Sequence, residues 1–217
     1  MTGVNPITGK ALHAEGLLPN LLRVHYKQWV DITNKNVVLS QHLDLPLYHD
    51  GAPAWFEHST RNNVDVVAIP LSLADFKDFA NECINSVDQE AGLEVCAGMD
   101  CFILGFPERM IGAGNTPIWK RGSIASEPYQ QHPYLVDSAT REGMSGAPVI
   151  ARHTGIFGMK GGKLTGSEII GTVEKFIAIY SGRIGDDALG FQLGRAWQSN
   201  VLDDILHGKL RGKHPLQ

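Results

Sequence analysis

The sequence of this 217-residue chain has few of the features that mark membrane, nucleic-acid-binding or disulfide-stabilised proteins. No apolar run approaches the roughly 18 residues that a membrane-spanning helix needs. Lysine and arginine together number only 19, the formal net charge is −4, and the basic residues are scattered. A soluble protein is therefore predicted, with neither a nucleic-acid groove nor a membrane surface among its partners.

Cysteine is also scarce, and the pattern of the three cysteines argues against two kinds of site. Cys83, Cys96 and Cys101 are odd in number, and their spacing matches neither a C-x-x-C motif nor a Cys/His metal site. A disulfide framework and a zinc site are therefore not expected, and a reducing, cytoplasmic compartment fits best. The first residues show no basic segment followed by an apolar one, so no signal peptide is visible.

The glycine-rich stretches at 158–166 and 112–117 do not complete a nucleotide-binding motif. Beside the first, Phe157 stands where a phosphate-binding loop requires glycine, and Lys163 is followed by Leu164 rather than serine or threonine. The second lacks the last glycine of the dinucleotide fingerprint, and no strand–helix unit surrounds it. The first stretch is interpreted as a hairpin loop, and no cofactor is expected.

Hydrophobic periodicity predicts an all-β protein. A chain of 217 residues that is 43% hydrophobic can bury a substantial core, and all-β proteins of this size often form one unit with two lobes. Strands are predicted at 22–26, 36–40, 64–69, 101–105, 134–136, 146–151, 168–173 and 176–180. The turns between several of these runs contain glycine or proline, as is typical of a β-sandwich or barrel.

Two segments are predicted to be helical instead. Residues 74–84 suit a helix between the two halves of the chain. A C-terminal helix is predicted to end near Gly208, because glycine commonly terminates helices. Its apolar face is expected to contain Trp197, Val201, Leu202, Ile205 and Leu206.

The most informative stretch is 141–150, where a serine is flanked by glycines ahead of an apolar strand. Gly143 and Gly146 allow the backbone to turn tightly around Ser145, so that the amides of Gly143 and Ser145 converge on a developing oxyanion. Serine nucleophiles are usually presented in this way. The alternative is a Gly/Ser turn without chemistry, since the same spacing occurs in ordinary turns between strands.

Five short segments, taken together, carry a resemblance to a known family. They are residues 63–70, 102–107, 117–126, 143–148 and 179–183. In this order they resemble the bacterial trypsin-like serine peptidases of the chymotrypsin fold, over about residues 20–206. The resemblance implies a double β-barrel with an N-terminal barrel lobe at 1–73 and a partly helical connection at 74–94. A C-terminal barrel lobe with a short helix would then occupy 95–217.

The resemblance implies peptide-bond hydrolysis through an acyl-enzyme, with a peptide or protein as the substrate. Ser145 matches the nucleophile, and Gly143 with Ser145 matches the oxyanion hole. Asp65 matches the acid that orients the catalytic imidazole. The alternative for Asp65 is a solvated aspartate on a strand edge.

The same resemblance implies how a substrate would be held. The strand against which a substrate backbone pairs would be formed by Ile179, Tyr180, Ser181 and Gly182. Ala139 would lie near the base of the specificity pocket. Neither Ala139 nor Thr140 is acidic, so a preference for lysine or arginine is not expected, and a small or apolar substrate side chain is favoured.

The general base is where this sequence departs from the family. Chymotrypsin-type enzymes place histidine before aspartate and aspartate before serine in the chain. The histidines before Asp65 are His13, His25, His42, His49 and His58. His25 is predicted on the polar face of a strand beside Arg23 and Lys27. The last three lie in a loop-like region that contains two prolines, close in sequence to Asp65.

His13 has a tolerable separation from Asp65 but stands in the wrong sequence context. In the family the catalytic histidine ends a strand in a Thr-Asn-x-His-like context, and residues 3–9 resemble the segment on the C-terminal side of that histidine. The catalytic histidine is therefore expected to lie just upstream of Met1, and the first strands of the first barrel are expected to lie upstream with it. An open strand edge that favours self-association would result. The function is then an endopeptidase whose base lies upstream, or an inactive peptide-binding or structural module.

Overall fold

The structure is a computed structural model, and it divides the chain into two compact units. Unit 1 contains residues 1–81 and 202–217, and unit 2 contains residues 82–201. The residues described are 13–15, 17–32, 35–60, 64–72, 74, 76, 83–84, 93–129, 132–157, 163–184 and 192–213. Strands dominate this part of the chain, which contains a single α-helix, so the all-β prediction is confirmed.

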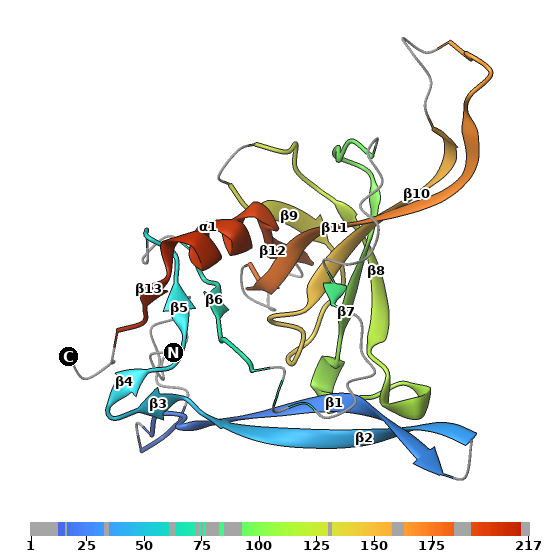
Figure 1. Cartoon of the computed structure of the whole chain (residues 1–217). Coiled ribbons are helices and arrows are strands. Elements are labelled where there is room, and N and C mark those ends of the chain that lie inside the picture. The colour runs from blue at the N-terminus through green and yellow to red at the C-terminus, as the bar shows by residue number, and fades with distance from the viewer. Residues whose placement is uncertain are drawn as a thin grey trace. The chain divides into compact units, whose positions relative to one another are not determined.

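Unit 2 is built around a closed barrel of six antiparallel strands (Figure 1). In barrel order they are β10 (Pro148–Phe157), β11 (Ile169–Arg183), β12 (Leu193–Gln198), β9 (Tyr134–Asp137), β8 (Ile118–Ile124) and β7 (Asp100–Gly105). Alternate side chains are buried along β7 because strand side chains point to opposite faces. Cys101 and Ile103 of β7 join Val136, Val149 and Ala196 in one hydrophobic core.

Two strands of the barrel continue beyond it as an arm (Figure 1). β10 pairs with β7 only from Val149 to Ala151, whereas it pairs with β11 along its whole length to Phe157. The predicted strands at 168–173 and 176–180 are one strand, β11, since the residues between them continue the ladder opposite β10. The arm is therefore a two-stranded ribbon attached to a closed barrel.

The strands of unit 1 form smaller sheets. A long hairpin pairs β1 (Leu21–Ile32) with β2 (Lys35–Pro46), and a two-stranded sheet pairs β3 (Tyr48–His49) with β4 (Ala52–Pro53). A three-stranded sheet has the order β13 (Leu210–Arg211), β5 (Phe56–Glu57) and β6 (Val67–Ala68). The strand predicted at 64–69 is thus only β6.

Residues 202–217, which the sequence pattern placed with the second lobe, group with unit 1. The reason is the pairing of β13 with β5, together with a hydrogen bond from the Gly212 amide to the Trp55 carbonyl (2.9 Å). Trp55 is fully buried and contacts Tyr48 edge to face. This pairing spans most of the chain, so local sequence patterns do not reveal it.

The C-terminal helix is present as α1 (Asn200–Gly208) and ends where it was predicted to end. Val201 and Ile205 are buried, but Leu206 is 54% exposed. Trp197 was wrongly placed on this helix, because it belongs to β12, where it is buried next to Ala196. The helix predicted at 74–84 lies mostly outside the described residues.

Candidate active site

The turn that carries Ser145 is held by β11 from behind. The Gly146 amide donates to the Tyr180 carbonyl (2.7 Å), and the Tyr180 amide donates to the Ala147 carbonyl (2.8 Å). The Ala147 amide donates to the carbonyl of Met144 (3.0 Å), whose side chain is fully buried in the barrel core. Ser145 itself is exposed. The turn therefore presents a serine to solvent from a fixed backbone.

Gly143 has no room for a side chain. Its φ is +87°, and a Cβ at this position would lie 2.5 Å from the Phe106 carbonyl oxygen. The neighbouring Glu142 carbonyl accepts a hydrogen bond from the Glu108 amide (2.7 Å). The 106–109 segment thus braces the turn, and glycine is the residue that fits both the φ angle and the close approach.

Two amides of the turn carry no internal hydrogen bond. Met144 and Gly146 donate to backbone carbonyls, whereas within the described part of the chain Gly143 and Ser145 donate to none. Unpaired backbone N–H groups on a fixed turn stabilise negative charge as it develops on an oxygen. These are the two donors that the sequence predicts for an oxyanion hole.

An open strand edge lies beside Ser145. A Cβ on Gly182 would lie 3.6 Å from the Ser145 hydroxyl oxygen, so these residues are neighbours. β11 pairs with β10 up to Ile179, but Gly182 pairs only with Arg195 of β12. No described strand covers the other edge of Ser181 and Gly182, and such an edge can accept an extended peptide as an added strand.

Tyr180 fills the space behind this edge. Its ring is almost fully buried, and its hydroxyl lies 2.5 Å from the Thr140 hydroxyl, which is equally buried. Burial raises the pKa of Tyr180, and the hydrogen bond to Thr140 opposes that rise. A Cβ on Gly194 would collide with the tyrosine ring, whereas Ala139 remains half-buried beside Thr140. The Thr140 hydroxyl is therefore bonded to Tyr180 rather than open to a ligand.

Asp65 lies in unit 1, whereas Ser145 lies in unit 2. Its side chain is exposed, and it comes two residues before β6, next to the buried Val66. Its role as the triad acid stays a prediction.

His13 does not have the geometry of a triad base in this structure. It is exposed, and its Nδ1 accepts a hydrogen bond from the Glu15 amide (3.2 Å). In a catalytic triad that nitrogen carries the proton and donates it to the aspartate. His13 therefore remains a candidate by sequence order alone.

The structure also shows the contacts of three other histidines before Asp65, namely His25, His42 and His58. His25 and His42 face each other across the β1–β2 hairpin, so the interpretation of His42 as part of a loop was wrong. β2 continues to Pro46 because apolar and polar residues keep alternating past His42. His58 has Nδ1 bonded to the Thr60 amide (3.1 Å) and Nε2 3.5 Å from Asp204.

Unit 2 supplies no imidazole to Ser145 from its described residues. His132 stacks against Tyr129, with ring centroids 5.2 Å apart, and His153 contacts Phe157 at 5.6 Å. Neither has a hydrogen bond to Ser145. The base that would activate the hydroxyl is therefore not among the described residues of this unit.

None of the three cysteines is in a disulfide. Cys83 and Cys96 are exposed, while burial, with a smaller effect of Asp100, raises the pKa of Cys101 to about 12. Among the described residues there is no group of three or more His, Cys, Asp or Glu side chains that could hold a metal ion. Within the same part of the chain, no helix has the length and apolar character needed to cross a membrane.

Sequence reasoning missed two contributors to this site. Phe106, whose carbonyl fixes Gly143, lies within a segment that carries the family resemblance, but no role was predicted for it. Tyr180 was expected only as part of a substrate-binding strand, and its buried bond to Thr140 joins residues 40 positions apart. The Phe106-Pro107 pair after β7 is the sequence signal that could have indicated the role of Phe106.

Comparison with known proteins adds no relative to this description. No protein-family model, no curated protein sequence and no solved structure matches this chain. A functional interpretation therefore depends on the geometry of the Ser145 turn and on the short segments that resemble trypsin-like peptidases.

Proposed function

We propose that this protein is a serine endopeptidase of the trypsin-like type, with Ser145 as the nucleophile. The observation that carries the proposal is the pair of unbonded amides, Gly143 and Ser145, on a turn fixed by β11 and by the 106–109 segment. In this proposal the barrel of unit 2 is the second barrel of a chymotrypsin-like pair. Unit 1 is an incomplete first barrel.

The proposed chemistry is acyl transfer in two steps. The Ser145 oxygen attacks the scissile carbonyl carbon as a histidine takes the hydroxyl proton, and the carbonyl oxygen becomes an oxyanion that accepts from the Gly143 and Ser145 amides. The amine then leaves with that proton, and water hydrolyses the ester. The histidine lies outside the described residues, and Asp65 orients it.

The substrate in this proposal is an extended peptide with a small side chain next to the cleaved bond. Its backbone adds to the open edge at Ser181 and Gly182. Tyr180 already occupies the space behind that edge, and its hydroxyl is bonded to Thr140. A large side chain would have to displace a buried ring, which disfavours it.

A second candidate is a peptide-binding module without catalysis. It is favoured by the described part of unit 2, in which neither His132 nor His153 has a hydrogen bond to Ser145. The open edge beside Gly182 would then bind a peptide with no attack by Ser145.

Peptide boronates distinguish these functions, because boron forms a tetrahedral adduct only with an attacking oxygen. We expect acetyl-Ala-Ala-boroAla to give a tetrahedral ¹¹B NMR signal that Ser145→Ala abolishes. Ser123→Ala, which removes a half-buried serine on β8, should leave it unchanged. The corresponding boroPhe peptide should bind at least about tenfold more weakly.

The non-catalytic module predicts another pattern. The ordinary peptide acetyl-Ala-Ala-Ala-amide would bind as tightly as the boronate, and Ser145→Ala would bind both normally. That result would replace the peptidase proposal by the binding module. Failure of both ligands to bind would contradict both functions.

A further inference from the structure

The arm of unit 2 has a second open strand edge, far along β10 from Ser145. Pairing with β7 ends at Ala151, and from Arg152 to Phe157 β10 pairs only with β11. The segment before β7 does not continue the ladder, because the Gly98 amide donates to the Ile124 carbonyl of β8 (2.7 Å). The described residues therefore leave the other edge of 152–156 without a strand partner.

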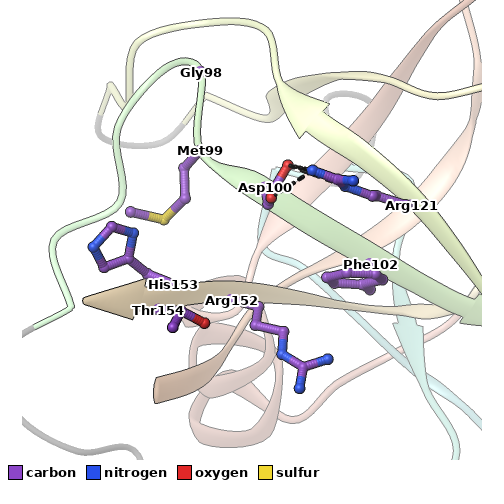
Figure 2. Close-up of a pocket in the computed structure, with 8 residues that line it drawn as sticks. All are labelled: Gly98, Met99, Asp100, Phe102, Arg121, Arg152, His153 and Thr154. Carbon is purple, nitrogen blue, oxygen red and sulfur yellow. Dashed lines mark hydrogen bonds and ion pairs between the residues drawn. The ribbon is translucent and has the colours of Figure 1, made fainter. Parts of the chain in front are cut away.

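A pocket of about 680 Å³ opens beside the start of this edge. This volume falls within the range of ligand pockets in proteins. Its lining includes Met99, Asp100, Phe102, Arg121, Arg152 and Thr154. Figure 2 shows the side chains of β7, β8 and β10 around the pocket, with the Asp100–Arg121 pair on one side and Met99, which precedes β7, on the other. The pocket thus combines an aromatic and a thioether surface with charged groups.

Arg152 is oriented before any ligand arrives. Its Nε lies 3.2 Å from a Glu174 carboxylate oxygen, and its guanidinium carbon lies 5.8 Å from the centre of the Phe102 ring. Within the described part of the chain its two Nη groups have no hydrogen-bond partner. A guanidinium held through Nε and an aromatic face can offer both Nη groups to one carboxylate.

The unused guanidinium donors around the pocket favour an acidic ligand. Arg121 uses Nε and one Nη for Asp100, which leaves its other Nη without a partner among the described residues. The charged side chains of the lining are two arginines and one aspartate, in a chain whose net charge is −4. Each arginine is paired with one carboxylate, Asp100 or Glu174, so the formal charges cancel, and the site would attract a further carboxylate through its unused guanidinium donors.

The arm continues the same surface with apolar side chains. Arg152, Thr154 and Ile156 alternate along β10 and so share one face. Ile156 is paired with Ile170 of β11, and these side chains are 41% and 81% exposed. A peptide strand added along this edge would lie first beside Arg152 and then beside the exposed pair of Ile156 and Ile170.

We propose that the β10 edge and this pocket bind an extended peptide that carries acidic side chains alternating with apolar ones. Its backbone pairs with 152–156, one carboxylate binds the Nη groups of Arg152, and an apolar side chain lies over Phe102 and Met99. A second copy of this chain fits less well, because the β10 edge offers Arg152 and His153 but no carboxylate. This binding needs no chemistry at Ser145.

A designed peptide tests the proposal directly. Fluorescein-labelled Glu-Val-Glu-Val-Glu-Val is titrated with the full chain, and fluorescence anisotropy is read at an ionic strength of about 50 mM, where surface charges are weakly screened. The matched controls are Lys-Val-Lys-Val-Lys-Val and the acidic peptide with alternate amides N-methylated. The acidic peptide should bind at least about tenfold more tightly than either control. Equal binding of the basic or the methylated peptide would overturn the proposal.

Two arginine variants test whether the acidic peptide binds at the arm. Arg152→Gln should weaken acidic-peptide binding at least about tenfold, since a charge-assisted hydrogen bond is lost. Arg23→Gln removes another exposed, carboxylate-paired arginine on a hairpin and should change nothing. Arg152 is 45% exposed, so folding should survive, and unchanged unfolding curves verify this.

Hydrogen exchange gives an independent measurement on the unaltered protein. The acidic peptide should slow exchange of the amides at 152–156 on the open edge, with the protein monomeric throughout. Equal weakening by both variants would overturn the proposal. So would protection of this edge by concentration-dependent dimerisation without peptide, which would assign the surface to a second copy.

Discussion

Unit 2 and unit 1 differ in how much backbone structure supports the proposed chemistry. In unit 2, six strands close on themselves, and the turn at Ser145 is tied to β11 and to the 106–109 segment. In unit 1, the sheets have two or three strands, and Asp65 lies on an exposed segment before a two-residue strand. The two backbone features of the proposed site, the closed barrel and the fixed turn at Ser145, are therefore complete in unit 2. The proposed acid, Asp65, belongs to unit 1, and neither described histidine of unit 2 has a hydrogen bond to Ser145.

This comparison shows that the Ser145 turn is fixed by backbone contacts alone. The Gly143 and Ser145 amides are oriented by backbone hydrogen bonds and by the Phe106 carbonyl, none of which involves a histidine. An oxyanion hole of this kind would persist in a chain with no base. Labelling and stability experiments can therefore test the turn separately from catalysis.

The largest expected effect is on the turn of unit 2. Gly143→Ala places a Cβ against the Phe106 carbonyl at a positive φ, so it should lower the free energy of unfolding by about 2–5 kcal/mol. Gly146→Ala is the matched control, because its φ is also +87° but no atom lies within 4 Å of the new Cβ. It should cost only about 1–2 kcal/mol. Urea unfolding followed by tryptophan fluorescence measures both, and equal losses would show that the Phe106 contact does not constrain the turn.

The next largest effect is expected in amide hydrogen exchange, which compares the stability of the two units. We expect the paired amides of β1 and β2 to exchange at least about tenfold faster than those of β7 to β12, because a two-stranded sheet opens locally more readily than a closed barrel. Self-association through an open edge of unit 1 would reduce this difference as concentration rises. Equally strong protection of both units in a strictly monomeric sample would contradict the comparison.

The buried hydroxyl pair should give an intermediate effect. Tyr180→Phe leaves the Thr140 hydroxyl buried without its partner, and Thr140→Val does the reverse, so each should cost about 1–3 kcal/mol. The double variant should lose clearly less than the sum of the two, because neither hydroxyl then remains unpaired. Additive losses in this double-mutant cycle would show that the pair does not act as a unit.

The smallest expected effect is an acid-dependent loosening of the unit 1 hairpin. The Arg23 side chain bonds both Asp44 oxygens (2.6 and 2.7 Å) and lowers the pKa of that carboxyl below its ordinary value of 3.8. The lowered pKa means that the stabilisation is complete above pH 3.8 and is lost as pH falls through the folded value. An NMR titration of the Asp44 carboxyl should show this low midpoint, and Arg23→Gln should raise it. An unchanged midpoint in the variant would exclude Arg23 as the cause.

Local patterns predicted the parts of the structure that local chemistry determines. The Gly-Met-Ser-Gly stretch indicated a tight turn before a buried strand, and the structure has one at Ser145. The α1 helix also ended at Gly208 as predicted. Trp197 fits a helical spacing with Val201 and breaks the alternation of β12, because the adjacent Ala196 is also buried, so periodicity favoured the wrong element.

Long-range pairings were beyond the reach of these patterns. The bond between Thr140 and Tyr180 and the pairing of β13 with β5 join residues far apart in sequence, and neither has a local signature. His42 was misplaced because the prolines after it suggested a loop, while the hairpin partner that keeps it in a strand lies upstream. Tertiary contacts decide such cases.

Labelling with a fluorophosphonate tests the central claim most directly, namely that Ser145 is a fixed nucleophile whose base lies outside the described residues. On the chain as it stands, mass spectrometry should find the label on Ser145, at a rate roughly a millionfold below that of a complete triad. Ser145→Ala should abolish this labelling, whereas His13→Ala and His58→Ala should leave its rate unchanged. Rapid labelling that His13→Ala or His58→Ala abolishes would contradict the account, as would labelling of a different serine.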